Sequence, residues 1–345
     1  MYNGQATEII DLKIPELRHF GACKSPDYIP LRATRGFCGT HLQGKPLIFG
    51  GIDYETRKHY VLQDYCIIGH TNQMLKMIEK RFYAACVSLN QQQDSTIWIV
   101  GGKNRRLGRG GLRNNARYED EHLKSTEIIS LRKPPILGPV LPFSISYHGI
   151  VKCYKNDDIY LIGGEQNGCL SDKTWIVNIM DPKSGSGFRI KEGPTLLQKR
   201  SGFSCGQMKI KGKHILVVVG GYGEKNNALF SVELLDPSSD KGWVKGKQLF
   251  EIYIVVVILE KYILLYIFLG PRLPIKLAET AMVTSPSGDG VIVIGGYNSD
   301  TEENSRAIYE LKGQTKKWTI LKQSLEHTPN GAGLIAIPIS EEFIT

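Results

Sequence analysis

The chain has 345 residues, of which 41% are hydrophobic, so it is long enough to bury a large core within a single domain. Its net charge of +9 favours acidic partners and excludes no fold class. The seven cysteines form no Cys-x-x-Cys pair, no Asn-x-Ser/Thr sequon occurs, and the first residues lack a signal-peptide pattern. We therefore expect reduced thiols and a cytoplasmic location. An extracellular, disulfide-bonded protein is the alternative.

A short apolar run that ends in two glycines occurs five times along the chain. Four consecutive β-branched or aromatic residues predict a strand that is covered on both faces. The glycine pair supplies a positive φ, or a close backbone approach, at the end of that strand. The first glycines of the pairs are separated by 51, 62, 57 and 75 residues, and they are Gly50, Gly101, Gly163, Gly220 and Gly295.

The two ends of the chain each carry half of a repeat. Residues 7–12 nearly repeat residues 126–131, which follow a Gly-Gly strand and are expected to form the third strand of their unit. Residues 331–339 are typical of the first strand of a unit. Because a ring of sheets must pair its ends or leave two exposed edges, we expect five whole units and a sixth formed by both termini. A gene model truncated at the N-terminus, or a three-stranded closing unit, would explain the missing Gly-Gly strand.

The repeats share a second signature, Gly-Pro-x-Leu, which begins at Gly138, Gly193 and Gly270. With Tyr309 and Trp318 nine residues apart, these motifs resemble those of the Kelch-repeat family over about residues 7–339, apart from 247–270. The resemblance implies an all-β fold, a six-bladed Kelch-type β-propeller whose last blade is closed by N- and C-terminal strands. Residues 1–345 would form this single domain.

The resemblance also implies a function, because Kelch propellers mostly bind other proteins through one loop face. In the similar BTB–Kelch adaptors this face holds the substrate of a ubiquitin ligase, and other relatives bind actin. The BTB and BACK regions that recruit a ligase do not occur in this sequence. We expect a non-catalytic interaction scaffold whose partner is a protein with an acidic segment, with actin or a ubiquitin-ligase substrate as examples.

One segment does not fit the repeats. Residues 250–269 are nearly all apolar, but Glu260 and Lys261 would lie in the middle of a membrane span, at roughly 2.5–3.5 kcal/mol each, so no membrane contact is expected. Removing residues 247–270 joins Gly246 to Pro271, restores Gly-Pro-x-Leu and shortens the longest spacing from 75 to 51 residues. We interpret this segment as a β-prone insertion within the fourth complete blade, produced by a retained intron.

The segment after the second Gly pair, residues 103–124, is the main candidate for a binding loop. Mobile arginines spaced by glycines can bind carboxylates of a partner. A solvated loop without a partner is the alternative, and one Arg-Gly-Gly stretch without interleaved aromatic residues does not predict specific nucleic-acid binding. The candidates in this loop are Lys103, Arg105, Arg106, Arg109, Arg113 and Arg117. Positions at the start of blades add Arg35, Arg81, His148 and Arg200, for which ordinary capping or turn hydrogen bonding is an equally good alternative.

Catalysis has little support in the sequence. The eight histidines form no close set of metal ligands. Each Gly pair precedes another strand rather than a helix, so it does not form a phosphate-binding loop. We therefore expect no enzyme activity, metal or cofactor. A metal-dependent propeller enzyme, with ligands that converge at the centre of the ring, is the alternative.

Overall fold

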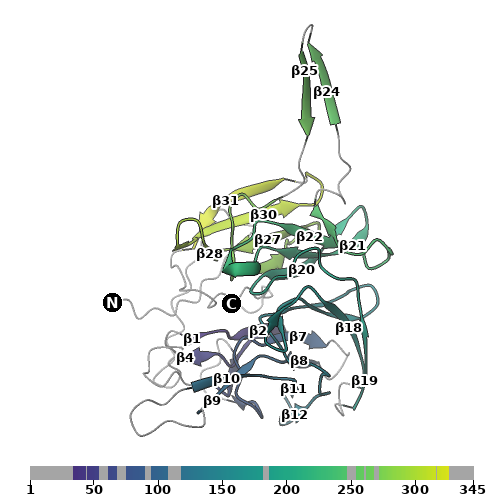
Figure 1. Ribbon diagram of the computed structural model, residues 1–345. Helices are drawn as coiled ribbons and strands as arrows, with labels where there is room; N and C mark the ends of the chain where they lie inside the picture. The colour runs from purple at the N-terminus through teal and green to yellow at the C-terminus, as the bar shows by residue number, and fades with distance from the viewer. Residues whose placement is uncertain are drawn as a thin grey trace.

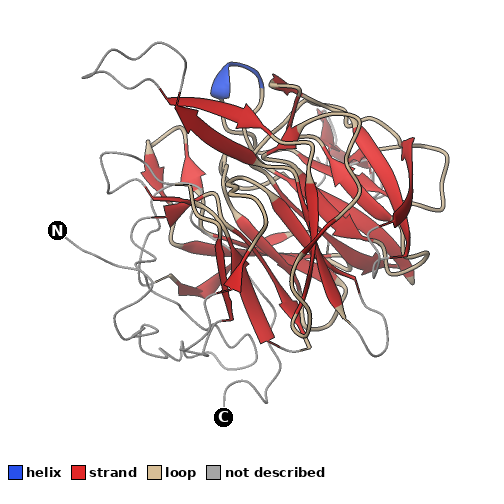
Figure 2. Cartoon of the chain, turned by 90° about the horizontal axis from the view of Figure 1, so that it is seen from below, coloured by secondary structure: helices blue, strands red, loops and turns tan. Residues whose placement is uncertain are grey.

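The computed structural model describes residues 34–325, except 44, 54–60, 68–74, 90–94, 108–117, 182–185, 247–253, 260–261, 268–271 and 316. This part of the chain consists of β-strands and loops with one short 3-10 helix, η1 (Glu224–Asn226) (Figure 2). The all-β prediction is confirmed. The terminal segments 7–12 and 331–339, which were expected to close the ring, lie outside the described residues.

Five four-stranded antiparallel sheets follow one another along the chain, and we call them blades 1 to 5 (Figure 1). Blade 1 contains β2 (Cys38–Leu42), β3 (Lys45–Phe49), β5 (Asp64–Ile67) and β6 (Leu75–Lys76). Blade 2 contains β7 (Ala85–Leu89), β8 (Thr96–Val100), β11 (Thr126–Ser130) and β12 (Ile136–Leu137). Blade 3 contains β14 (Gly149–Lys152), β15 (Ile159–Ile162), β18 (Thr174–Asp181) and β19 (Ser186–Glu192). Blade 4 contains β20 (Ser204–Ile210), β21 (Lys213–Val219), β22 (Val232–Leu235) and β23 (Val244–Lys245). Blade 5 contains β26 (Ala281–Thr284), β27 (Gly290–Ile294), β30 (Ala307–Lys312) and β31 (Trp318–Ser324). The Gly-Gly run is the second strand of every blade.

The core lies between neighbouring blades. Strands β8 and β27 are buried along their whole length, as uninterrupted apolar runs predict. One apolar cluster joins Phe49 of blade 1 to Ile97 of blade 2, and another joins Trp98 to Leu161 of blade 3. Further clusters join blades 3 and 4, and blades 4 and 5. Blades 2, 3 and 4 therefore bury both of their faces by stacking on the blades before and after them.

The Gly pairs mark the places where one blade passes close to the next. Gly101 has a φ of 57°, and a Cβ added to it would lie 2.2 Å from the carbonyl oxygen of Ile145 at the start of blade 3. The amide of the second glycine, Gly102, donates a hydrogen bond of 2.7 Å to the same carbonyl. Positive φ and close backbone approach are therefore both required here, which confirms the prediction.

The apolar segment forms a sheet of its own. Strands β24 (Ile254–Leu259) and β25 (Tyr262–Ile267) pair only with each other among the described strands. Figure 1 shows this hairpin projecting away from the blades, beyond blades 4 and 5. No helix in the described part of the chain is long and apolar enough to cross a membrane.

The backbone of blade 4 keeps the register of the other blades on both sides of this hairpin. Leu141 in blade 2 donates its amide to the carbonyl of Lys124 at 3.0 Å, and Leu273 donates to the carbonyl of Phe230, at the equivalent place in blade 4, at 3.0 Å. Before the hairpin, Lys245 pairs with Glu233 as Leu137 pairs with Glu127. Residues 247–270 are therefore additional residues, which blade 4 has between Lys245 and Leu273 and which blade 2 lacks between Leu137 and Leu141.

Candidate functional site

Short strands connect the segment after each Gly pair to the start of a blade, on the side of the molecule that we call the Gly-pair face. Strand β1 (Thr34–Arg35) pairs with β4 (Ile52–Asp53), and β13 (Ile145–Ser146) pairs with β16 (Glu165–Gln166), which also pairs with β17 (Cys169–Leu170). Single bridges join Phe82 to Lys103, Ser201 to Tyr222 and Ala278 to Tyr297. The structure thus brings together the two groups of segments in which the sequence placed candidate residues.

One residue from each blade forms a chain of backbone hydrogen bonds on this face, which we call the entry arc. Tyr83 donates to Gly36 at 2.5 Å, Tyr147 to Tyr83 at 3.0 Å, Gly202 to Tyr147 at 3.1 Å, and Glu279 to Gly202 at 2.8 Å. All five have a positive φ, between 52° and 66°. Glycine adopts this conformation freely, but tyrosine and glutamate do so at a cost in energy.

Aromatic and basic side chains meet on the part of the arc between blades 2 and 3. The rings of Tyr83 and Tyr147 stack, with centroids 3.7 Å apart. The Nζ atom of Lys103 lies 4.7 Å from the centre of the Tyr147 ring and 2.7 Å from Oε2 of Glu165. Lys103 is thus held over the stacked rings by a carboxylate and by a cation–π contact.

An acidic group occupies the part of the arc in blade 5. Burial raises the pKa of Glu279, and the nearby positive charge of Arg35 opposes this shift. Burial also raises the pKa of Tyr222, and the charge of Glu279 and the Tyr297 phenol raise it further. A partly desolvated carboxylate beside two phenols and a guanidinium can exchange hydrogen bonds with a polar group of a bound molecule.

A third cluster includes a serine, a histidine and a glutamate. Oγ of Ser146 lies 3.2 Å from Nδ1 of His122, and Nε2 of His122 lies 3.9 Å from Oε2 of Glu165. Burial lowers the pKa of His122, and the charge of Lys103 lowers it further. Ser146 is fully buried, so a substrate cannot reach its hydroxyl in this conformation. Among the described residues, no three His, Cys, Asp or Glu side chains are grouped to hold a metal ion.

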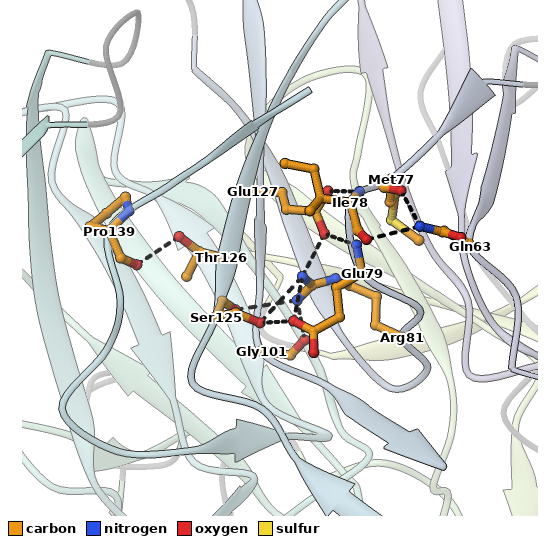
Figure 3. A network of polar contacts seen from close by, with 10 residues as sticks. All are labelled: Gln63, Met77, Ile78, Glu79, Arg81, Gly101, Ser125, Thr126, Glu127 and Pro139. Carbon is orange, nitrogen blue, oxygen red and sulfur yellow. Dashed lines mark hydrogen bonds and ion pairs between the residues drawn. The ribbon is translucent and has the colours of Figure 1, made fainter. Parts of the chain in front are cut away.

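Arg81 was expected on the binding face but is buried within blade 2 (Figure 3). Its Nη2 atom lies 2.6 Å from Oε1 of Glu127, and Nη1 donates to the carbonyl of Gly101 at 2.7 Å. The other carboxylate oxygen of Glu127 accepts the amide of Ile78 at 2.7 Å. This guanidinium therefore holds the start of blade 2 to its own third strand, and it is buried rather than exposed on the surface.

Arg200 repeats the same arrangement in blade 4. Its Nη2 atom lies 2.5 Å from Oε1 of Glu233, and Nη1 donates to the carbonyl of Gly220 at 2.8 Å. Glu233 also accepts the amide of Leu197 at 2.7 Å. Arg81 and Arg200 were expected among the partner-binding residues, but in this structure both guanidinium groups are buried and paired within the chain.

His148 is also buried, and neither of its ring nitrogens has a hydrogen-bond partner. Burial lowers its pKa to about 3, so the ring is neutral near pH 7. A Cβ on the second glycine of a pair would contact His148 in blade 3, Phe37 in blade 1 and Phe203 in blade 4. His148 therefore fills a buried place that phenylalanine fills in two other blades.

The predicted loop 103–124 begins and ends as a β-hairpin made of β9 (Lys103–Leu107) and β10 (Tyr118–His122). Nε of Arg105 lies 2.7 Å from Oδ1 of Asp120, and Nε of Arg106 lies 2.6 Å from Oε2 of Glu121. The acidic end of the segment thus neutralises its basic start. Arg109, Arg113 and Arg117 lie outside the described residues, and Arg35 lies beside Glu279.

Sequence reasoning did not identify Tyr83, Tyr147 or Glu279. A signal was present, because each lies two residues before the first strand of its blade, where blades 1 and 4 have Gly36 and Gly202. Two glycines at one position of a repeat indicate that this position needs a positive φ. The remaining blades therefore carry larger side chains at a strained position.

No family model matches the chain, and no curated protein matches it in sequence. Its fold is similar to the solved structure of YjhT, a bacterial Kelch-repeat β-propeller protein, with a TM-score of 0.54 at 12% sequence identity. The match covers 83% of this chain and 84% of that chain. At this identity the similarity establishes the fold alone, a Kelch-type β-propeller.

Proposed function

We propose that this Kelch-type β-propeller is a non-catalytic scaffold that binds a partner protein on its Gly-pair face, over the entry arc. The observation that supports this most strongly is the backbone strain. Gly36 and Gly202 adopt the positive φ of the arc without cost, whereas Tyr83, Tyr147 and Glu279 do so at about 1 kcal/mol or more each. Side chains that are kept at such a cost are typical of binding sites.

The chemistry of the arc favours an acidic segment of the partner. Lys103 lies over the stacked rings of Tyr83 and Tyr147, where a partner carboxylate would meet both a cation and an apolar surface. The arginines of the β9–β10 hairpin play a smaller part than the sequence predicted, because Arg105 and Arg106 already pair with carboxylates of their own chain. Actin and a ubiquitin-ligase substrate are the partner classes that the Kelch resemblance implies. Binding either of them fits a cytoplasmic location of this protein.

Site-specific cross-linking tests this proposal. A photo-reactive phenylalanine analogue at Tyr147 should cross-link the partner in cell extract. The same group at Tyr154, which is 69% exposed in the turn between β14 and β15 at the other end of the blade, serves as the matched control. Equal capture at the two positions, or capture at Tyr154 alone, would contradict binding over the arc.

Reversing one charge tests whether the partner contacts the entry arc through an acidic segment. We expect Lys103→Glu to reduce cross-linking from Tyr147 by at least tenfold, because a carboxylate would then repel the partner. Lys213→Glu, which also removes a lysine–carboxylate pair but lies at the first turn of blade 4, should leave capture unchanged. If both variants capture the partner as well as the parent protein does, its contacting segment is not acidic.

A further inference from the structure

Two buried cysteines face each other between blades 1 and 2. Cys38 begins β2 and Cys86 lies in β7, and both belong to the apolar cluster that joins these blades. Both side chains are buried. Two residues further along each strand, Oγ1 of Thr40 lies 3.1 Å from Oγ of Ser88. Because side chains two apart on a strand share a face, this contact places Cys38 opposite Cys86 where β2 packs on β7.

The other described cysteine side chains have no such partner. Cys205, on β20, packs against Gly149 of β14, where an added Cβ would lie 2.6 Å from its Sγ atom. Cys205 thus occupies a similar place at the contact between blades 3 and 4, but a glycine lies opposite. Cys153 is fully buried, and Cys169 is exposed on β17. The pairing of thiols is therefore specific to blades 1 and 2 within the described part of the chain.

We propose that Cys38 and Cys86 are a modification site, and that they form a disulfide between blades 1 and 2 when the chain folds in the presence of a disulfide oxidant such as oxidised glutathione. The thiolate of one cysteine attacks a sulfur of the oxidant and releases one glutathione thiolate. The thiolate of the second cysteine then attacks the mixed disulfide and releases the other. The two protons lost by the cysteines are taken up by the two glutathione thiolates, and the oxidant gains two electrons.

The surroundings of the pair determine when this bond forms. Burial raises the pKa of the Cys86 thiol, and the nearby Cys38 raises it further, so the reactive thiolate is scarce once blades 1 and 2 have packed. The surrounding core cluster also keeps glutathione out. Exchange should therefore be fast in the unfolded chain and slow in the folded one, and a bond that has formed should resist reduction to the same degree.

Refolding in a glutathione redox buffer tests the proposal. After quenching with N-ethylmaleimide under denaturing conditions, five of the seven thiols should be labelled, and peptide mapping should recover Cys38 linked to Cys86. Refolding with reduced glutathione alone should give seven labelled thiols. The oxidised protein should melt at a higher temperature than the reduced one, because the bond restricts the unfolded chain.

Variants separate this bond from other pairings. Cys205→Ser should still form the linked peptide, whereas Cys38→Ser and Cys86→Ser should not, and should lose the rise in melting temperature on oxidation. Mapping of the parent protein decides the question even where a serine variant does not fold. Seven free thiols in correctly refolded protein at an oxidising glutathione ratio, or a linked peptide from any other pair, would overturn the proposal.

Discussion

The buried ion pairs at Arg81 and Arg200 lie where other blades place apolar side chains. In blades 1 to 4, the amide of the second glycine donates a hydrogen bond to the carbonyl of the residue that enters the next blade, which is Arg81, Ile145, Arg200 or Leu277 in turn. The equivalent positions on the third strands, in the same order, are Glu127, Trp175, Glu233 and Tyr309. The blades therefore use either an arginine with a glutamate, or an aliphatic residue with an aromatic one.

This substitution pattern predicts the outcome of a paired exchange in blade 4. Arg200→Leu alone leaves the Glu233 carboxylate buried without its cation, and we expect it to lower the free energy of unfolding by roughly 3–5 kcal/mol. Adding Glu233→Tyr reproduces the pair of blade 5, Leu277 and Tyr309, and should restore stability to within about 1–2 kcal/mol of the parent protein. Urea unfolding measures both values. A double variant as unstable as the single one would show that the site requires the charges.

His148 makes stability depend on pH. Its pKa is about 3 in the folded protein and 6.5 in the unfolded chain, so below pH 6.5 the unfolded chain takes up a proton that the folded protein does not. The free energy of unfolding should therefore fall as the pH drops from 6.5 towards 3, by roughly 3 kcal/mol at pH 4 from this group.

Replacing His148 with phenylalanine should remove this pH-dependent contribution to the free energy of unfolding, because phenylalanine does not titrate. The larger ring should fit, since Phe37 and Phe203 fill the equivalent places in blades 1 and 4. Urea unfolding of His148→Phe at pH 7 and pH 4 measures the effect. We expect a smaller acid-induced loss than in the parent protein, while the contributions of carboxyl groups cancel between the two proteins. An identical loss in both would mean that His148 is protonated in the folded state.

The partners of single residues were the hardest feature to predict. Arg81 and Arg200 were predicted from the sequence as candidate binding residues at the start of blades, and nothing in the sequence connected them to Glu127 or Glu233. Each pair spans 46 or 33 residues, so only the packing of a blade's first loop against its third strand brings the two together. Local patterns carry no information on such contacts, so the sequence could not decide between partner binding and hydrogen bonding within the chain for either arginine.

Among the strands, the buried ones were predictable and the peripheral ones were not. Uninterrupted apolar runs before each Gly pair specified all five second strands, and residues 126–131 were correctly expected to form a third strand, because β11 pairs with β8. The outer strands β6, β12 and β23 have two residues each, too few for any periodicity. The segment of the β9–β10 hairpin was predicted as a mobile loop because glycines space its arginines, yet charges at its two ends pair across the two strands.

The β24–β25 hairpin gives a prediction at the scale of an element. Deleting residues 247–270 leaves Gly246 three residues before Leu273, the same step that separates Gly138 from Leu141 in blade 2. We expect the deletion variant to keep the circular dichroism spectrum of the parent protein, to melt at the same or a higher temperature, and to aggregate less, because two apolar strand edges are removed.

Size-exclusion chromatography with light scattering and a thermal melt measure these effects. As a control, a deletion of equal length within the blades, which removes part of β21 and β22, should abolish cooperative unfolding. Loss of the folded state in the 247–270 variant would show instead that the hairpin is part of the blade 4 structure.

At the scale of the whole molecule, the repeat spacing predicted five complete blades in the right order, and the structure contains them. The sixth blade, which the termini were expected to share, falls on residues outside the described part. The entry arc could not be predicted in full, because it consists of main-chain hydrogen bonds between residues 47 to 77 positions apart. Only the arrangement of blades around a common axis brings these residues into contact.

The arc links the blades to one another, and hydrogen exchange can measure how strongly. The amides of Tyr147 and Gly202 are donated to neighbouring blades, so they can exchange only when blade 2 separates from blade 3, or blade 3 from blade 4. Since each separation would also open an apolar cluster, we expect both amides to exchange as slowly as those of β8. The amide of Asp300, which is donated only to the side chain of Asn298 in an exposed turn, should exchange at least a thousandfold faster. If the two arc amides exchange as fast as Asp300, the arc opens without separating the blades, and its strained residues act only locally.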